Sequence, residues 1–191
     1  MLDVPDCRVT NEIELHPVEL AHAEARFRLV VANREYLRQW MPWVDGVRGI
    51  ADAEAVIEHN MEQRRNDVAY QLGIWCNDQL CGAIGLHAIN WANRFVSLGY
   101  WLDAGHQGRG IMTACCRAVV NHAFDGLHLN RVIIRCAVEN HKSRAIPERL
   151  GFQQEGILRD GEWLYDHYVD LASYAQLSRE RSHGARSPGD P

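Results

Sequence analysis

One glycine-rich segment has residue types and spacing suited to binding a phosphate. Residues 102–113 read LDAGHQGRGIMT, with three glycines between a predicted strand and a predicted helix. The first amides of a helix lack intrahelical partners and the helix dipole is positive there, so such a loop can bind an anion. Ile111 stands where a Walker loop requires lysine, and Thr113 where a dinucleotide fingerprint requires glycine. We therefore expect another kind of phosphate ligand, with a plain glycine turn as the alternative.

The six cysteines and ten histidines show no sequence pattern typical of a metal site. No two cysteines have CxxC spacing and no HExxH segment occurs, so we expect no metal and interpret Cys115 and Cys116 as core residues. A hydrolase triad is not indicated, because a Gly-x-Ser-x-Gly segment is missing. His87, His106 and His167 are possible bases, and none is assigned a role.

The flanking sequence predicts the elements that position the glycine loop. Apolar periodicity predicts a strand at 12–15 and helices at 18–33 and 51–66, then strands at 70–76, 80–89 and 95–102. A helix at 111–124, a strand at 131–138, a short helix at 143–150 and two final strands follow. This order predicts an α+β, or mixed α/β, domain. Because a helix separates strands 95–102 and 131–138, we expect these two strands to be parallel.

Length, composition and charge restrict the class of protein. A chain of 191 residues, 47% hydrophobic and 24% charged, predicts one globular domain over 1–179. Residues 180–191 are rich in Arg, Ser, Gly and Pro and are predicted to be a disordered tail. The net charge of -5 argues against a nucleic-acid partner. With neither a membrane-spanning apolar run nor a signal-like N-terminus, we expect a cytoplasmic protein without a membrane partner.

Two motifs together resemble the cofactor motifs of the GNAT acetyltransferase superfamily. The sequence QGRGIM at 107–112 resembles its pyrophosphate loop, and Asn140-x2-Ser143 followed by RLGF at 149–152 resembles its second motif. The segments GYWL at 99–102 and WMPW at 40–43 resemble the RimJ/RimL-type protein N-acetyltransferase branch. The resemblance extends from about residue 10 to residue 179.

This resemblance implies a fold and a cofactor. The expected fold is a mixed, mostly antiparallel sheet of about seven strands, flanked by helices and splayed between two parallel strands. The splay admits the pantetheine arm of acetyl-CoA. The cofactor-binding residues implied are Leu102, Gln107, Gly108, Arg109, Gly110, Ile111, Met112, Thr113, Asn140 and Ser143.

The resemblance also implies catalytic roles. Glu162 is expected to take the proton of the amine, directly or through water, unless it is a solvated hairpin residue. Ser143 is expected to reach the CoA sulfur, and it is also a residue type that favours a helix N-cap. The family often places a tyrosine acid where this sequence has Pro147. An amide of strand 98–100 is expected to polarise the thioester, and Met112 replaces a usually small residue.

The acceptor is the least determined part of the prediction. An α-amine with a pKa of about 7.7–8.0 is more readily neutral than a lysine near 10.4, which favours a protein N-terminus of the ribosomal-protein type. Trp40, Trp43 and Tyr100 line the acceptor site by resemblance, or belong to the core. Acetylation of a polyamine, an aminoglycoside or another small amine, and a non-catalytic acyl-CoA sensor, remain alternatives. The chain is expected to be a monomer or a homodimer.

Overall fold

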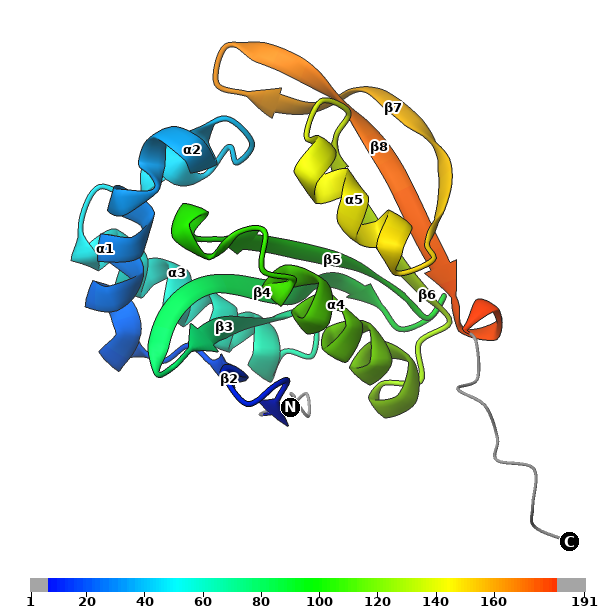
Figure 1. Cartoon of the computed structure of the whole chain (residues 1–191), viewed down its shortest axis with the longest axis horizontal. Helices are drawn as coiled ribbons and strands as arrows, with labels where there is room; N and C mark the ends of the chain where they lie inside the picture. The colour runs from blue at the N-terminus through cyan, green and yellow to red at the C-terminus, as the bar shows by residue number, and fades with distance from the viewer. Residues whose placement is uncertain (1–6, 182–191) are drawn as a thin grey trace, which may run out of the picture.

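The computed structural model of the chain describes residues 7–181 (Figure 1). Most of the predicted tail, 182–191, lies outside the described residues, as do residues 1–6. The first two residues of the predicted tail are described: Glu180 ends a short 3-10 turn, and its carboxylate accepts a hydrogen bond from the amide of Leu177 at 2.9 Å. Arg181 pairs with Asp125. No helix of residues 7–181 is long and apolar enough to cross a membrane.

A single mixed sheet forms the centre of the protein (Figure 1). Its spatial order is β1-β2-β3-β4-β5-β6-β8-β7, and every neighbouring pair is antiparallel except β5 and β6. The strands are β1 (Cys7–Arg8), β2 (Ile13–Pro17), β3 (Tyr70–Cys76), β4 (Gln79–Asn90), β5 (Phe95–Leu102), β6 (Arg131–Ala137), β7 (Gln153–Leu164) and β8 (His167–Leu177). The predicted fold class is confirmed. The sheet has eight strands rather than about seven, because the two-residue β1 is too short to show a pattern.

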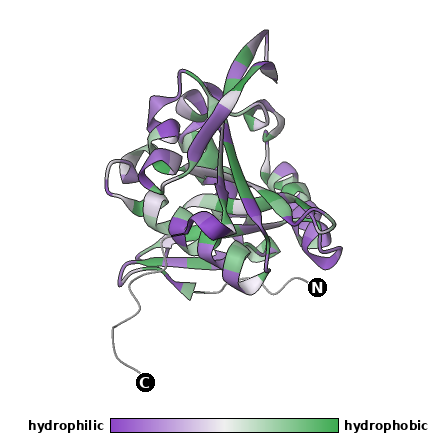
Figure 2. Cartoon of the chain, turned by 90° about the vertical axis from the view of Figure 1, so that its right-hand side faces the viewer, coloured by the Kyte–Doolittle hydropathy of each residue, from purple (hydrophilic) through white to green (hydrophobic). Residues whose placement is uncertain are grey.

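Helices cover both faces of the sheet. The helices are α1 (Ala23–Ala32), α2 (Arg34–Arg38), α3 (Ile50–Arg65), α4 (Ile111–Asn121) and α5 (His141–Arg149). Successive residues of a strand point to opposite faces, and Ile84 of β4 packs in the cluster that includes α4 while Ala83 packs in the cluster that includes α1 and α2. Figure 2 shows hydrophobic residues along the central strands and hydrophilic residues on the surrounding helices.

The parallel pair β5 and β6 is joined over only three residue positions. Their register runs from Phe95↔Arg131 to Ser97↔Ile133, although β5 continues to Leu102 and β6 to Ala137. The far edge of β5 pairs with β4 up to Leu102, and the far edge of β6 pairs with β8 up to Ala137. Each strand is therefore held by its other neighbour while the two diverge. The predicted splay is confirmed, and it leaves backbone N–H and C=O groups facing an opening.

Asn33, at the joint between α1 and α2, attaches these helices to the end of β5. This side chain is only 5% exposed. Its Nδ2 donates to the carbonyl of Leu29 at 2.9 Å and to Oδ1 of Asp103 at 2.7 Å, and its Oδ1 accepts from the amide of Ala104 at 2.9 Å. One buried amide thus hydrogen-bonds three polar groups from two parts of the chain.

We predict that Asn33→Ala lowers the free energy of unfolding by about 2 kcal/mol, because it removes three hydrogen bonds of a buried side chain and leaves the half-buried Asp103 carboxylate with one partner fewer. Urea denaturation followed by circular dichroism measures this loss. Asn66→Ala, at an exposed position after α3, is the matched control and is expected to cost less than about 0.5 kcal/mol. Equal stability of the two variants would contradict the role given to Asn33.

Candidate active site

The glycine loop ends in an uncapped helix. Gly108 (φ +74°) and Gly110 (φ +76°) adopt left-handed backbone conformations that strain other residues. Gly110 is the N-cap of α4, and no side chain caps this end. A Cβ built at either glycine meets no heavy atom within 4 Å, so the space beside the loop is open. The free amides of the first turn, at residues 111–113, therefore form a site for an anion.

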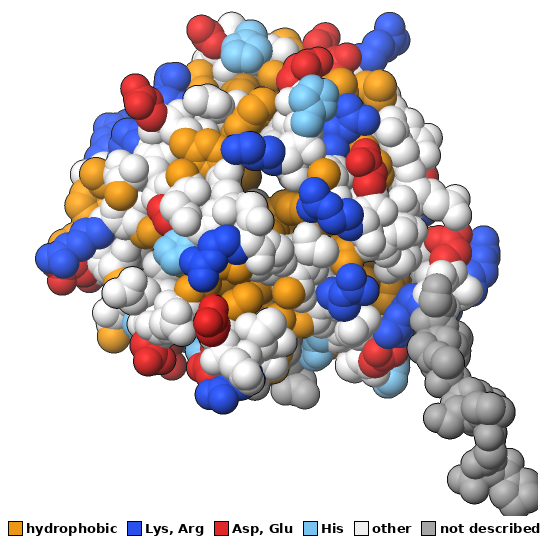
Figure 3. All heavy atoms as spheres, viewed as in Figure 1, with side chains coloured by type: hydrophobic (Ala, Val, Ile, Leu, Met, Phe, Trp, Pro, Cys, Tyr) orange, Lys and Arg blue, Asp and Glu red, His pale blue; other side chains and the backbone are white. Residues whose placement is uncertain are grey.

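Basic side chains surround this loop although the chain as a whole is acidic. Arg117 of α4 and Lys142 and Arg149 of α5 line the same cavity as the loop, which has a volume of about 830 Å³. Lys142 Nζ donates to Oε1 of Gln107 at 3.1 Å. Figure 3 shows a hollow on this face with hydrophobic side chains inside it and Lys and Arg side chains around its rim. The sequence analysis included Arg149 in the second motif but missed Arg117 and Lys142, because these two come from different helices that only the fold brings together.

Nearly all predicted cofactor residues line this cavity, which we call the loop cavity. They are Leu102, Gln107, Gly108, Gly110, Ile111, Met112, Thr113, Asn140 and Ser143. Arg109 is the exception. Its side chain is exposed, and its Nη2 lies 3.8 Å from Oε2 of Glu12. Only the backbone of Arg109 belongs to the loop.

Asn140, not Ser143, caps α5. The Oδ1 atom of Asn140 accepts a hydrogen bond from the amide of Ser143 at 3.1 Å. Ser143 is the third helical residue, so the expectation that it serves as the N-cap is wrong. Its side-chain hydroxyl is consequently free of the capping role and is half-buried beside β5.

Pro147 determines what the backbone of Ser143 binds. Proline has no N–H, so the carbonyl four residues earlier in the helix loses its usual donor. That carbonyl belongs to Ser143, and it accepts a hydrogen bond from the Tyr100 hydroxyl at 3.2 Å. The Ser143 hydroxyl in turn donates to the Tyr100 oxygen at 3.3 Å. Two residues 43 positions apart therefore form a pair of hydroxyls that faces the opening between β5 and β6.

Burial keeps the Tyr100 hydroxyl protonated. Desolvation raises its pKa well above the ordinary value of a tyrosine. The position where the family resemblance expects a tyrosine acid holds Pro147, and the structure supplies a tyrosine from β5 instead. Sequence analysis placed Tyr100 at the acceptor site and had no means of detecting its contact with α5.

A second cavity, of about 710 Å³, lies on the other side of this hydroxyl pair. We call it the acceptor cavity, and its lining includes Trp40, Trp43, Tyr100 and Glu162. Trp43 also packs on Trp101, with ring centroids 5.9 Å apart, so it contributes to both the core and the cavity wall. Six residues line both cavities: Trp40, Met41, Tyr100, Trp101, Asn140 and Ser143. The two cavities thus meet at the Tyr100–Ser143 pair.

An irregularity in β7 directs Glu162 to the acceptor cavity. The β7–β8 register passes from Leu158↔Leu171 to Glu162↔Val169, so β7 has extra residues here and bulges. A Cβ at Gly161 would lie 2.9 Å from the Leu171 side chain, which explains the glycine. Glu162 is half-buried, and desolvation raises the pKa of its carboxyl group. Glu162 lies on the β7–β8 hairpin, and its partial burial favours the acid–base role over the alternative of a solvated hairpin residue.

The three histidines considered as bases lie in different surroundings. His87 lines the acceptor cavity, and burial lowers its pKa, which favours the neutral imidazole. His106 lines the loop cavity and hydrogen-bonds Asp103, while His167 is exposed and hydrogen-bonds Asp166. Only His87 is placed on the same cavity as Glu162.

The site has the parts needed to bring two ligands together at one point. An anion-binding loop opens on one cavity and a half-buried carboxylate on the other, with two hydroxyls where they meet. A group carried by the first ligand can be passed directly to a nucleophile on the second, with a proton acceptor and a proton donor in reach.

Comparisons with known proteins agree with this arrangement. The family model for the acetyltransferase (GNAT) domain matches residues 12–153. YdaF of Bacillus subtilis, a candidate ribosomal N-acetyltransferase, is 37% identical over 91% of this chain and 96% of its own length. The ribosomal-protein-serine acetyltransferase of Escherichia coli is 32% identical, covering 89% and 95%.

A solved structure gives the same result for the fold. RimL, a ribosomal L7/L12 α-N-protein acetyltransferase in complex with coenzyme A, superposes with a TM-score of 0.87 at 28% identity, over 91% of this chain and 98% of that one. The expected family is confirmed: the chain is a member of the GNAT acetyltransferase superfamily, in its RimJ/RimL-type branch.

Proposed function

We propose that this protein transfers the acetyl group of acetyl-CoA directly to the α-amino group of a protein N-terminus of the ribosomal-protein type. We also propose that residues up to 179 make up one catalytic domain. The observation that carries the proposal is the meeting of the loop cavity and the acceptor cavity at the Tyr100–Ser143 pair. The RimL-type relatives support the protein acceptor, because their names record ribosomal-protein substrates.

The loop cavity fits acetyl-CoA, which supplies an activated thioester when bound. The amides after Gly110 suit the pyrophosphate, and Arg117, Lys142 and Arg149 suit its remaining phosphate charge. The opening between β5 and β6 offers unpaired backbone groups to an amide-containing arm. Residues 98–100 of β5 lie beyond the paired segment and line the acceptor cavity, so one of their amides is placed to polarise a thioester carbonyl.

The Tyr100–Ser143 pair is the proposed proton donor to the departing sulfur. Hydroxyl groups rotate to suit a partner, so either one can turn its proton from the other toward the sulfur. The raised pKa of Tyr100 ensures that the pair carries its protons at neutral pH. The Asn140 cap and Pro147 act as positioning residues, since they hold Ser143 against β5.

Glu162 is the proposed acceptor of the amine proton, directly or through a water. Its raised pKa remains suited to deprotonating an α-ammonium group, which is far more acidic than a lysine ammonium group. A covalent acetyl-enzyme is disfavoured. Cys136 lines the acceptor cavity, but burial raises the pKa of its thiol and so disfavours the nucleophilic thiolate.

Removing the hydroxyl pair is expected to slow turnover without weakening cofactor binding. We predict that Ser143→Ala and Tyr100→Phe each lower kcat about 30-fold. The double variant should lose about 10²-fold, less than the roughly 10³-fold product of the single effects, because the groups act as a unit. Steady-state kinetics and calorimetric titration with CoA measure both quantities. Tyr168→Phe, at an exposed tyrosine of β8, is the control. An unchanged kcat in the double variant would remove this pair from the mechanism.

The Glu162→Gln variant is expected to lose about 10²-fold in kcat while CoA affinity stays the same. Because the carboxylate is the active form, wild-type kcat/KM should fall one additional power of ten per pH unit below the raised pKa of Glu162. The variant should show only the titration of the acceptor amine. Glu58→Gln, at an exposed glutamate of α3, is the control. Identical pH profiles for Glu162→Gln and wild type would exclude Glu162 as the base.

The acceptor class is tested with a mixed panel and intact-mass detection of acetyl transfer. The panel contains serine-started peptides, their N-terminally blocked counterparts with free lysines, polyamines and aminoglycosides. We predict transfer only to free peptide N-termini. Transfer only to a small amine would keep the chemistry and overturn the acceptor, while tight CoA binding without any transfer would favour an acyl-CoA sensor.

A further inference from the structure

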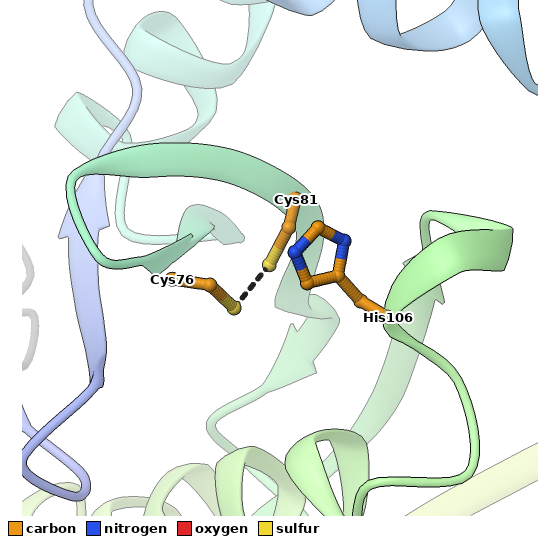
Figure 4. A group of neighbouring side chains, drawn as sticks. All are labelled: Cys76, Cys81 and His106. Carbon is orange, nitrogen blue, oxygen red and sulfur yellow. Dashed lines mark hydrogen bonds between the residues drawn. The ribbon is translucent and has the colours of Figure 1, made fainter.

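Three side chains with metal-binding atoms converge beside the glycine loop (Figure 4). Cys76 ends β3, Cys81 lies in β4 after the hairpin turn, and His106 belongs to the 3-10 turn η3 (Ala104–His106) after β5. One ligand atom from each residue lies within 4.8 Å of the other two. We call these residues the Cys–Cys–His cluster. The sequence analysis did not predict this cluster, because His106 follows Cys81 by 25 positions and no local spacing motif connects them.

His106 is oriented toward the sulfurs by a carboxylate. Its Nδ1 lies 2.7 Å from Oδ2 of Asp103 and donates to this carboxylate, so Nε2 is the ring nitrogen that can bind an ion. Figure 4 shows the imidazole ring next to Cys81. Asp103 is itself fixed, because its Oδ1 accepts from Asn33 at 2.7 Å and its amide donates to the carbonyl of Cys81 at 2.7 Å. A carboxylate bonded to the second nitrogen of a histidine ligand is a recurring arrangement in protein zinc sites.

We propose that Cys76, Cys81 and His106 bind one zinc ion, with Asp103 as the positioning residue of His106. The ligand set is two sulfurs and one imidazole, which suits zinc and similar thiophilic divalent ions. The spacing Cys-x4-Cys across a hairpin turn lies within the range of zinc-binding cysteine pairs. Two thiolates neutralise the charge of Zn²⁺, which allows the ion to reside next to an apolar core. Binding releases the two thiol protons to solvent.

The separation of the sulfurs defines the adjustment that metal binding requires. The two Sγ atoms are 2.6 Å apart. Two sulfurs that each lie about 2.3 Å from a tetrahedral zinc are roughly 3.7 Å apart, so the thiols must move apart by about 1 Å. Rotation of the Cys76 and Cys81 side chains is the movement that this change requires. A simple disulfide would explain the approach of the sulfurs, but it would give no role to His106 or Asp103.

The cluster also has a route to solvent and a further sulfur nearby. The His106 side chain is 26% exposed and lines the loop cavity, so an ion can reach it from that side. Cys115 of α4 is buried and lies near enough to interact electrostatically with Cys76 and Cys81. It or a water can complete four ligands. A bound ion would tie the β3–β4 hairpin to the segment that leads into Gln107 and Gly108, and so stiffen the loop.

Zinc binding is measured on the full-length protein, reduced with a phosphine and kept without oxygen. We expect one zinc per chain after loading with zinc chloride and desalting. Cobalt(II) titration should give the intense sulfur-to-cobalt charge-transfer absorption of thiolate ligation. Cys81→Ala and His106→Gln should each weaken zinc binding at least 100-fold in a chelator competition, and Asp103→Asn about 10- to 100-fold. The proposed acetyl transfer plays no part in these readouts.

Two matched controls separate this site from adventitious binding. Cys116→Ala removes a buried thiol of α4, and His59→Gln removes an exposed imidazole of α3. Both variants should keep the wild-type zinc affinity. Circular dichroism is used to check that every variant is folded. Sub-stoichiometric zinc in the reduced wild type, cobalt spectra without thiolate bands, or equal affinity of His106→Gln and wild type would overturn the proposal.

Discussion

The incomplete pairing of β5 and β6 is the constraint on which the rest of the site depends. Two neighbouring strands that pair along their full length leave no gap between them. By contrast, β5 and β6 pair at three positions and then diverge. The divergence is stable because each strand keeps its other neighbour, β4 for β5 and β8 for β6. The opening connects the loop cavity with the acceptor cavity. The two proposed ligands, acetyl-CoA and the acceptor amine, meet there.

Local features of the sequence orient α4 and α5 on either side of this opening. Gly108 and Gly110 allow the chain to turn from β5 into α4 and expose helix amides at one mouth. On α5, the Asn140 cap and the missing amide of Pro147 direct Ser143 to Tyr100. Each of these features makes the backbone of a helix or strand less regular. Each leaves a polar group available to a ligand, which is where a catalytic protein is expected to depart from ideal local structure.

The fold and the loop could be read from the sequence because they rest on local patterns. Strand alternation and the glycine spacing located β5, α4 and the parallel crossover, and the structure confirms them. Contacts between distant segments had no such pattern. Tyr100 with Ser143, the basic rim of the loop cavity and the Cys–Cys–His cluster all arise from side chains that only the fold brings together. The misassigned cap of α5 shows the same limit at short range, since Asn140 and Ser143 are both favourable capping residues.

The most direct test of this account is a crystal structure with a bisubstrate analogue, coenzyme A joined through its sulfur to the N-terminus of a serine-started peptide. The account predicts the pyrophosphate on the amides of 108–113 and the pantetheine between β5 and β6. It places the sulfur within hydrogen-bonding reach of Tyr100 and Ser143, and the peptide in the cavity that contains Glu162. A pantetheine arm that lies outside the opening between β5 and β6 would contradict the account. A peptide that extends from the sulfur into the loop cavity, and not into the acceptor cavity, would also contradict it.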